Sequence, residues 1–506
     1  MEKRTLTSFD SLSAAGDASV ILLGGSLTLD PTSKWFDLSQ NMLNALTLFM
    51  GWVVARGGIR VSATDRRKLQ ITLVDDVSQC SNATFVATNM LSGRILGRPA
   101  DFLFAPYGSS LAECGALPHP IPSYGGSRLF CRPPKPALFL FSVAASKVAH
   151  EKRALLLSTG ASATSVFKDR PLAFGTFNPS VQFLHTGIEM LQQLGVGSIA
   201  LLGEDGPAEV LFCQGAAQKA LQLGLNITER ITISAKLNQS EIALALRRYD
   251  VSRPDAIVGC TGYVTCTEFL KQAAASSFYA RAMLFVICVS DSRFTREYPF
   301  LAPYVLGATP WSEYSTTPDD LAGWSAATFN KRYVDAFKMQ PSYHAASTFA
   351  GGTLLVHAIE ECGCLEAEAV AKQLKSTRVR TVFGDIRFDQ NRQNVQPFVT
   401  LQYDANLMLR IATAETAIYP IPTWAKRLCE FEGRCRGNGG CLDDGKCKSP
   451  GCPIGEYAIT GEGVEKCDAC AAGFFSAAIG SVTACVACAE GTHAHAHTHC
   501  RSSFPR

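Results

Sequence analysis

The stretch from Ser198 to Ile233, SIALLGEDGPAEVLFCQGAAQKALQLGLNITERITI, carries the pattern that decides the fold. It opens on a short apolar run at Ser198–Leu202, continues through the helical period of Val210–Leu223, and returns to an apolar run at Ile231–Ile233. Short, nearly all-apolar runs are typical of strands buried on both faces of a parallel sheet. The stretch therefore predicts a strand–helix–strand unit of an α/β fold.

The same alternation extends on both sides of this stretch. In the same half of the chain it predicts the helices Val181–Leu194, Gln239–Tyr249 and Cys266–Ala275 and the strands Ala256–Val258 and Met283–Val286. An earlier series predicts the strands Val20–Leu23, Leu69–Val74, Asp101–Ala105 and Ala154–Leu157 and the helices Leu38–Ala55 and Ala83–Leu91. Two such series predict an α/β protein with two lobes, each a doubly wound parallel sheet. Ligands of such sheets bind outside the carboxyl ends of the strands, so we expect a crevice between the lobes.

Length and composition limit the classes of protein to which the chain can belong. Its 506 residues are enough for more than one domain, and 47% of them are hydrophobic, which excludes bulk disorder. The 47 Lys and Arg residues nearly balance the 44 Asp and Glu residues and form no long cluster, so nucleic acid is not an expected partner. The sequence lacks the G-x-S-x-G, Walker and G-x-G-x-x-G signatures, so we expect neither enzyme activity nor a cofactor.

Cysteine is concentrated near the end of the chain. Of the 19 cysteines, ten lie in the 72 residues from Cys429 to Cys500. They are Cys429, Cys435, Cys441, Cys447, Cys452, Cys467, Cys470, Cys485, Cys488 and Cys500. A segment so poor in large aliphatic residues cannot bury a sufficient core, so disulfides or a metal must replace it.

The spacing within this segment leaves two alternatives. The pattern C-x2-C-x14-C-x2-C at 467–488 is close to that of a structural zinc site. However, the intervals 452–470, 467–485 and 470–488 are all 18 residues, and a repeated module stapled to itself explains this period better. We therefore favour disulfides and assign no metal. The run His493–His499, with four histidines at alternate positions, could hold zinc or copper weakly, but we favour low-complexity sequence.

Glycosylation acceptors point to the same environment as the cysteines. Triplets of the form N-x-S/T stand at Asn82, Asn226 and Asn238. Together with the cysteine-rich segment they favour an oxidising location, extracellular or at the cell surface. No secretory signal is visible at the start, and the longest uncharged stretch, Leu38–Ala55, contains too many polar residues to span a bilayer. We therefore expect either a fragment of a longer membrane protein or a missing N-terminus.

Several short motifs follow one another in a recognisable order. They are Val20-Ile-Leu-Leu-Gly24, Ala55-Arg-Gly-Gly-Ile59, Val74-Asp-Asp76, Ala105-Pro-Tyr-Gly-Ser-Ser110, Ser158-Thr-Gly-Ala-Ser162, Phe174-Gly-Thr-Phe-Asn-Pro179, Pro341-Ser-Tyr-His-Ala-Ala346 and Val382-Phe-Gly-Asp-Ile-Arg-Phe-Asp389. In these motifs the chain resembles the type I periplasmic-binding-protein superfamily. That superfamily includes bacterial branched-chain amino-acid binding proteins and the ligand-binding ectodomains of animal receptors.

The resemblance implies a domain organisation. It places a bilobal ligand-binding domain at 18–420, with one lobe at about 18–176 and 310–378 and the other at about 179–306 and 382–420. Crossings between the lobes near Thr176–Pro179, Leu306–Trp311 and Arg378–Gly384 would form a three-strand hinge that closes on a ligand. The segment 429–500 would be a stapled stalk resembling EGF-like and ephrin-receptor-like repeats.

In the first lobe the resemblance singles out the loops that follow two strands. Tyr107, Ser109 and Ser110 should open a helix, where N–H groups and hydroxyls suit a ligand carboxylate. The alternative is that one serine merely caps the helix. Ala161 and Ser162 resemble the second half of the same anchor.

In the second lobe three residues are candidates for the ligand. Tyr263 could stack over the ligand, and Asp291 could pair with an ammonium group or, alternatively, cap a helix. Asp205 lies in another loop expected to face the cleft.

Four cysteines outside the terminal segment are also disulfide candidates. The segment Glu113–Phe141 contains six prolines and is expected to be an inserted surface loop, with Cys114 and Cys131 at its base. Cys260 and Cys266 flank a loop, so we expect a local disulfide between them.

These features predict a receptor ligand-binding module that closes on a small polar ligand, an amino acid or related carboxylate, and passes the change to its stalk. Attachment to a membrane would come through a part outside this chain, and a homodimer is left open. The alternative is a soluble extracellular binding or adhesion protein with a degenerate cleft.

Overall fold

The computed structural model describes most of the chain up to Glu432 and only the backbone of short strands beyond it. The described residues are 3–7, 19–33, 36–106, 141–291, 293–432 and 445, and the strand segments 456–459, 466–469, 474–475, 486–487, 492–495 and 499–502. Tyr107, Ser109, Ser110, Cys114 and Cys131 lie outside these residues, as does most of the proline-rich segment.

The first lobe is built on a mostly parallel sheet with the strand order β1-β4-β2-β5-β6-β7, and β3 pairs with β4. The strands are β1 (Lys3–Thr7), β2 (Val20–Leu27), β3 (Ile59–Arg60), β4 (Arg66–Asp75), β5 (Phe102–Phe104), β6 (Leu156–Ser158) and β7 (Ala173–Gly175). The helices α1 (Phe36–Ala55) and α10 (Tyr343–Cys362) pack on one face, with α9 (Ala326–Phe337) and α11 (Ala367–Ser376) beside them. The helices α2 (Cys80–Leu91) and α3 (Phe141–Glu151) cover the other face.

The strand β2 shows why the strands of this sheet have nearly all-apolar sequences. All eight of its residues are buried, with Ile21 and Leu23 in the core under α1 and Val20 and Leu22 in the core under α2 and α3. Successive side chains of a strand point to opposite faces, so a central strand covered on both sides is nearly all apolar; the buried Ser26 of β2 donates a hydrogen bond to Asp76.

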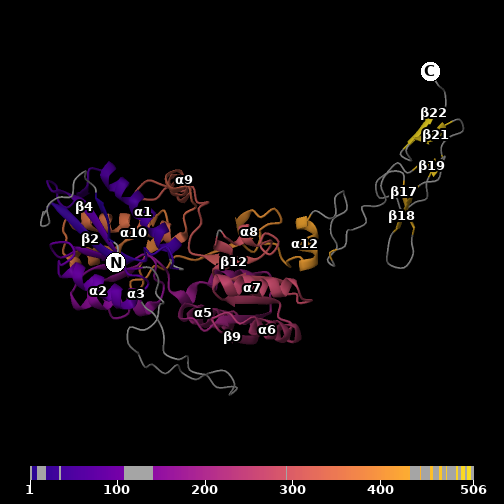
Figure 1. Ribbon diagram of the computed structural model, residues 1–506, viewed down its shortest axis with the longest axis horizontal. Helices are drawn as coiled ribbons and strands as arrows, with labels where there is room; N and C mark the ends of the chain where they lie inside the picture. Colours follow the sequence, from indigo (N-terminus) through magenta and orange to yellow (C-terminus); the bar gives the residue numbers. More distant parts are fainter. Residues whose placement is uncertain are drawn as a thin grey trace, which may run out of the picture.

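The second lobe repeats the plan with the strand order β16-β15-β12-β11-β10-β8-β9. Its strands are β8 (Ser198–Glu204), β9 (Asn226–Ile233), β10 (Ala256–Cys260), β11 (Ala282–Phe285), β12 (Leu306–Thr309), β15 (Val399–Tyr403) and β16 (Leu409–Ile411). The helices α4 (His185–Gln193) and α5 (Pro207–Gln222) cover one face. The other face carries α6 (Gln239–Ser252), α7 (Tyr263–Ala274), α8 (Arg293–Glu297) and the start of α12 (Trp424–Glu432). Figure 1 shows the two bodies side by side, which confirms the predicted two-lobed α/β class.

The chain passes between the two cores three times. Phe177 belongs to the first core and Phe183 to the second, and a second passage at Pro310 separates β12 from Trp311 of the first core. The antiparallel hairpin β13 (Arg378–Thr381)–β14 (Gly384–Arg387) still packs on the first core through Ile386. The third passage therefore lies between Phe388 and Phe398, later than the predicted Arg378–Gly384. The hairpin stays with the first lobe because its apolar side is buried there.

The disulfides of the second lobe differ from the predicted pairing. Cys260 bonds to Cys213 and Cys266 bonds to Cys288, so the predicted Cys260–Cys266 bond is wrong. The reason is that Cys260 ends β10 beside α5, whereas Cys266 lies inside α7 and faces the next loop. A further bond joins Cys362 and Cys364 after α10, and Cys429 in α12 is also disulfide-bonded.

The described strands of the terminal segment form three short antiparallel pairs. The pairs are β17 (Glu456–Ile459) with β18 (Lys466–Ala469), β19 (Phe474–Phe475) with β20 (Val486–Ala487), and β21 (Thr492–His495) with β22 (His499–Ser502). Their first strands begin at Glu456, Phe474 and Thr492, intervals of 18 residues that match the cysteine period. The remaining cysteines predicted to staple this segment, from Cys435 to Cys500, have no described side chains.

In the described part of the chain, no helix has both the length and the apolar character needed to cross a membrane.

Candidate functional site

The carboxyl ends of both sheets face the junction between the lobes. β7 ends at Gly175, just before the first passage, and β12 ends at Thr309, just before the second. The strands β6 and β11 run parallel to β7 and β12, respectively, so their carboxyl ends lie on the same edge of each sheet, whereas β15 runs antiparallel to β12. Gln396 of the third passage ties the three together: its carbonyl accepts from Asn178 Nδ2, and its Nε2 donates to the Pro310 carbonyl at 2.9 Å. The loops after the strands therefore surround an interlobe cleft.

A cavity of about 340 Å³ opens at this junction. Its volume is in the range of small-molecule sites, roughly 300–1,000 Å³. The second lobe contributes Ser290 and Tyr403 to its walls, and the first contributes the residues Gln340–Tyr343 that lead into α10. Thr309 and Trp311 line it from the second passage. A cavity with walls from both lobes would change shape when the lobes move, as a closing site requires.

Two predicted ligand residues, Tyr263 and Asp291, belong to one cluster on the second lobe. The guanidinium of Arg293 lies over the Tyr263 ring, with its Cζ 4.3 Å from the ring centroid. Arg293 also donates to both Asp291 oxygens, from Nε at 3.0 Å and from Nη2 at 2.6 Å. The Tyr263 hydroxyl donates to Glu297 Oε2 at 3.0 Å. Glu297 Oε1 also accepts from Arg296 Nη2 at 3.4 Å. The two carboxylates of the cluster are therefore matched by two guanidinium groups.

The electrostatics of this cluster follow from its contacts. Burial, and then the hydrogen bond to Glu297, raise the pKa of the Tyr263 phenol, so it remains a donor at neutral pH. The hydrogen bonds to Asp291 raise the pKa of Arg293, which stays charged. The Tyr263 hydroxyl is therefore a hydrogen-bond donor and Arg293 a cation at neutral pH.

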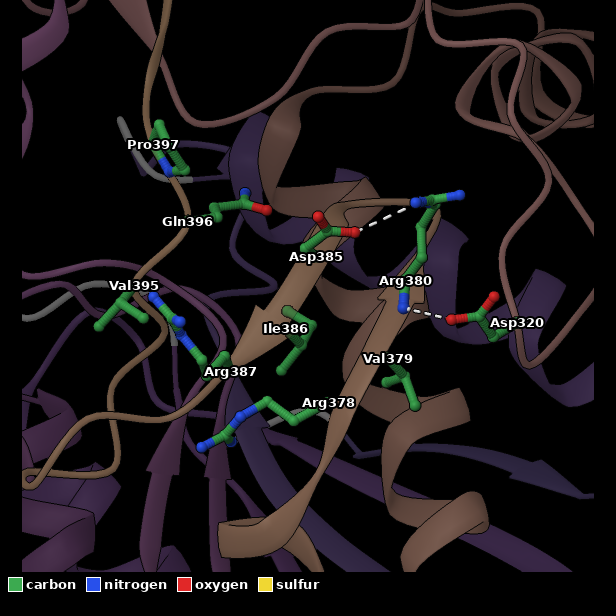
Figure 2. A pocket seen from close by; sticks show the side chains of 10 residues that line it. All are labelled: Asp320, Arg378, Val379, Arg380, Asp385, Ile386, Arg387, Val395, Gln396 and Pro397. Atoms are coloured by element: carbon green, nitrogen blue, oxygen red, sulfur yellow. Dashed lines mark hydrogen bonds and ion pairs between the residues drawn. The ribbon is translucent and has the colours of Figure 1, made fainter.

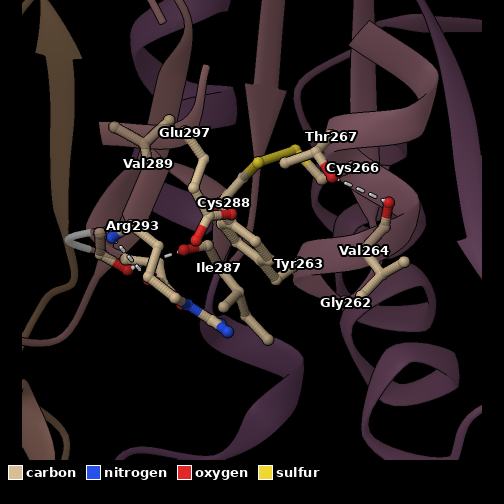
Figure 3. The surroundings of a disulfide bond; sticks show 12 residues. Gly262, Tyr263, Val264, Cys266, Thr267, Ile287, Cys288, Val289, Arg293 and Glu297 are labelled. Atoms are coloured by element: carbon tan, nitrogen blue, oxygen red, sulfur yellow. Dashed lines mark hydrogen bonds and ion pairs between the residues drawn. A yellow bond between two sulfur atoms is a disulfide. The ribbon is translucent and has the colours of Figure 1, made fainter. Parts of the chain in front are cut away.

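The disulfide Cys266–Cys288 holds the cluster together, as Figure 3 shows. Cys266 lies one turn into α7, which begins at Tyr263, and Cys288 lies in the short turn that leads to Asp291. Both ends of the cluster are therefore three residues from the same covalent bond. Tyr263 is the first residue of a helix rather than part of a loop, because α7 starts earlier than the predicted Cys266.

The first lobe faces this cluster with the start of α10. Ser342 caps the helix, accepting from the Ala345 N–H at 3.4 Å, and the next residues are Tyr343 and His344. Burial and the nearby charge of Asp291 raise the pKa of Tyr343, which places the two groups within electrostatic reach across the junction. Burial lowers the pKa of His344 to about 3, so its imidazole is neutral at physiological pH.

The predicted carboxylate anchor of the first lobe is described only in its second half. Ala161 is fully buried and Ser162 is 8% exposed, just after β6. The Ser162 hydroxyl shares a hydrogen bond with Ser180 Oγ at 2.7 Å, and its carbonyl accepts from Gln393 Nε2 at 3.0 Å. Ser162 thus joins its loop to the first passage and to the third. The ligand role of Ala161 and Ser162 stays a prediction.

The other predicted residues lie outside this junction cluster. Asp205 is exposed and accepts from the Ala235 N–H at 2.8 Å, beside the edge strand β9. Asn226 and Asn238 are exposed, whereas Asn82 is partly buried and its Nδ2 donates to the Asp76 carbonyl at 3.1 Å. Their glycosylation stays a prediction. Among the described residues, no group of three His, Cys, Asp or Glu side chains could hold a metal ion.

The sequence analysis missed three residues of the junction. Arg293 and Glu297 lie on α8, two and six residues after Asp291, and a basic residue so close to a candidate acid was the available signal. Tyr343 stands in the quoted motif at 341–346, where no side chain was singled out. Tyr343 lies near Asp291 because of the way the two lobes meet, and a local sequence pattern cannot predict that arrangement.

Comparisons with known proteins agree with this architecture. The family model described as "Periplasmic binding protein" matches residues 140–406. A putative branched-chain amino acid ABC transporter structure from Rhodospirillum rubrum is 16% identical with a TM-score of 0.60, covering 78% of this chain and all of that one. A leucine binding protein from Thermotoga maritima is 14% identical with a TM-score of 0.60, covering 78% and 98%. A solute binding protein from R. palustris in complex with benzoate is 17% identical with a TM-score of 0.57, covering 79% and 97%.

At these identities the structures show a shared fold, while the family model spans more than half of the 506 residues. Both findings agree with two parallel sheets whose carboxyl ends meet at a junction crossed three times. The chain belongs to the periplasmic binding protein family.

Proposed function

We propose that the chain is an extracellular ligand-binding module that closes its cleft on a small polar ligand, an amino acid or a related carboxylate. The observation that carries the proposal is the cavity of about 340 Å³ whose walls come from both lobes. Ligand that touches both walls is bound more tightly by the closed form, so it shifts the equilibrium toward closure.

The second lobe is proposed to read the ammonium end of the ligand. Asp291 is the proposed acceptor, because its carboxylate is the acidic group of the cluster whose charge acts on Tyr343, at the cavity wall of the first lobe. Tyr263 and Asp291 are not among the lining residues of the cavity, but Asp291 follows Ser290, which is, and the Tyr263 ring is covered on one side by Arg293. An ammonium ion near Asp291 would gain a charge-assisted hydrogen bond at a partly buried site.

The first lobe is proposed to read the carboxylate end. By family resemblance this role falls to Tyr107, Ser109 and Ser110, with Ala161 and Ser162 behind them. One structural relative is described as a leucine binding protein and another is in complex with benzoate; leucine and benzoate both contain a carboxylate, which supports this class of ligand. Asp205 is assigned a peripheral part, because its carboxylate is engaged at the sheet edge.

The remainder of the chain is proposed to form a stalk on an extracellular or cell-surface protein. Disulfides in the second lobe suit an oxidising compartment, and the strand pairs spaced 18 residues apart suit a repeated stapled module. Closure would reach this stalk through α12, whose Trp424 packs in the second core. EGF-like or ephrin-receptor-like identity, membrane attachment and glycosylation belong to the same proposal.

A second candidate is an adhesion or binding protein with a degenerate cleft. The observation that favours it is the engagement of Ser162 with Ser180 and Gln393, which occupies a hydroxyl expected to face the ligand. In that case the terminal repeats would make the partner contacts and the cleft would bind nothing.

A thermal-unfolding screen of the whole chain with the common amino acids and with benzoate tests both candidates. A ligand at 100 times its Kd should stabilise the protein by about 2.7 kcal/mol, which is a shift of several degrees in Tm. Asp291→Asn should abolish the shift given by amino acids. The matched control is Asp250→Asn, which removes an exposed carboxylate from α6, away from the junction.

A shift that survives in Asp250→Asn and disappears in Asp291→Asn supports the cleft. Failure of every ligand to raise Tm would reject it and leave the degenerate cleft. Equal loss in both variants would reject the role of Asp291.

A further inference from the structure

A second cavity lies outside the cleft, beside the hairpin β13–β14. Its volume is about 450 Å³, and it shares no lining residue with the cleft cavity, although a cavity of about 430 Å³ between them shares Gln396 with the one and Trp311 with the other. One wall is the hairpin and the other is Val395–Pro397 of the third passage, as Figure 2 shows. The cavity therefore belongs to the hinge side of the first lobe.

The register of the hairpin gathers charged residues on one face. Arg378 is the direct partner of Arg387, and Arg380 is the direct partner of Asp385. The alternate residue Ile386 is buried in the first core, so these four side chains share the exposed face. Directly opposed residues of an antiparallel pair have Cβ atoms about 4.5–5.5 Å apart, and like charges there repel.

The two carboxylates of the cavity are both committed to Arg380. Asp385 Oδ1 accepts from Arg380 Nε at 3.3 Å, and Asp320 Oδ2 accepts from the Arg380 main-chain N–H at 2.7 Å. Figure 2 shows both contacts and shows Arg378 and Arg387 extending from the other end of the hairpin. Arg380 is thus neutralised by its neighbours.

Arg378 and Arg387 have no such counter-ion. Arg378 Nη1 donates to the Thr377 carbonyl at 2.9 Å, which satisfies one of its five N–H groups. Within the described part of the chain, no carboxylate forms an ion pair with either guanidinium. Two opposed positive charges at the rim of a cavity create a local potential that favours an anion.

The wall opposite the arginines is fixed by hydrogen bonds. Gln396 Nε2 donates to the carbonyls of Pro310 at 2.9 Å and Phe383 at 3.2 Å, and the Val395 N–H donates to the Arg387 carbonyl at 3.1 Å. The cavity is therefore formed in the absence of ligand, so little conformational entropy of the chain is lost when a ligand binds there.

We propose that this cavity is an oxyanion site in which Arg378 and Arg387 grip one anionic group, of a phosphate, a sulfate or an organic carboxylate. The planar guanidinium presents paired N–H groups that match two oxygens of such an anion, and a shared anion removes the repulsion between the two arginines. The cavity volume leaves room for an organic group beyond the anionic one.

Isothermal titration of the whole chain with inorganic phosphate, sulfate and succinate, at constant ionic strength in chloride, tests the site. We expect saturable binding of at least one of the three anions. The relative affinities distinguish a tetrahedral inorganic ion from a carboxylate. Arg387→Gln should weaken binding about tenfold, as expected for the loss of a charge-assisted hydrogen bond, and Arg378→Gln/Arg387→Gln should abolish it.

Arg94→Gln is the matched control, because it removes one exposed arginine from the turn after α2. Arg378 and Arg387 are exposed, so their substitution removes no core contact and the variants should fold. Absence of saturable binding by all three anions up to millimolar concentration overturns the site, as does equal weakening by Arg94→Gln. Since the cleft cavity shares no residue with this one, Asp291→Asn should leave anion binding unchanged.

Discussion

The loops at the carboxyl ends of the two sheets occupy equivalent places but are held in different ways. In the first lobe they are held by hydroxyl groups: Thr159 bonds to Thr348 of α10 at 3.0 Å, and Ser162 bonds to Ser180 at 2.7 Å. In the second lobe the corresponding loops are held by two disulfide bonds, Cys213–Cys260 and Cys266–Cys288. No disulfide reaches the first-lobe loops among the residues that the structure describes.

The difference teaches which wall of the cleft can adjust. Hydroxyl pairs can exchange partners without breaking a covalent bond, and Ser162 is bonded to the first passage itself. The disulfide Cys266–Cys288 ties the start of α7, which carries Tyr263, to the turn that leads to Asp291, and so restrains the backbone on both sides of the cluster. We infer that the second lobe offers a preformed wall and that the first lobe adapts to it as the hinge moves.

The largest expected effect comes from removing the covalent ties. Replacing both cysteines of Cys213–Cys260 by serine should destabilise the second lobe by roughly 4 kcal/mol, and replacing both of Cys266–Cys288 by roughly 3 kcal/mol. The order follows from their sequence separations of 47 and 22 residues, because the longer loop gains more entropy in the unfolded chain. Guanidinium-chloride unfolding measures both. Loss of ligand binding in the second variant alone would show that this disulfide also positions the cluster.

Acid should loosen the first lobe. His344 has a folded pKa of about 3, below the 6.5 of the unfolded chain, so the unfolded chain binds a proton that the folded chain does not. Stability is therefore lost as pH falls below about 6.5, at up to about 1.4 kcal/mol per pH unit, or about 2 kcal/mol by pH 5. Unfolding midpoints of the wild type and of His344→Gln should converge as pH falls from 8 to 5. Parallel curves would contradict this assignment.

The hydroxyl ties of the first lobe should show non-additive substitutions. Thr159→Val leaves the buried Thr348 hydroxyl without its partner and should cost about 1–2 kcal/mol, and Thr348→Val should cost about the same. The double variant should cost less than the sum, because no unsatisfied hydroxyl remains. A double-mutant cycle by denaturant unfolding measures the coupling. Strict additivity would mean that the two hydroxyls do not stabilise each other.

Much of the fold was predictable because central strands are buried on both faces. The prediction Ser198–Leu202 matches the start of β8, and the two agree because every residue of that run is apolar or small. The edge strand β9 was predicted only at Ile231–Ile233, although it begins at Asn226. An edge strand pairs on one side only and is partly exposed, so its first residues are polar and carry no apolar signal.

The candidate site was less predictable because its contacts join residues distant in sequence. Tyr263 and Asp291 were singled out separately, but their shared partner Arg293 appears only once α7 and α8 are packed. The pairing of Cys266 with Cys288 depends on which face of α7 is turned to the next loop, not on sequence spacing. The third passage was misplaced for a similar reason, since only packing shows that Ile386 remains in the first core.

The smallest expected effect tests which charged end of the ligand binds to the second lobe. Arg293 competes with a ligand ammonium for Asp291, and its side chain is 46% exposed, so the pair is worth about 0.2–1 kcal/mol. Arg293→Gln should therefore raise the affinity for an amino acid by a factor of about 1.4 to 5, because the ligand no longer has to separate the pair. Isothermal titration of the variant with a ligand found by the thermal screen measures the change.

Arg296→Gln, on the same short helix and 70% exposed, controls for the general loss of positive charge. If Arg293→Gln instead weakens binding while Arg296→Gln does not, the guanidinium binds the ligand carboxylate. The second lobe would then read the end of the ligand that we assign to the first.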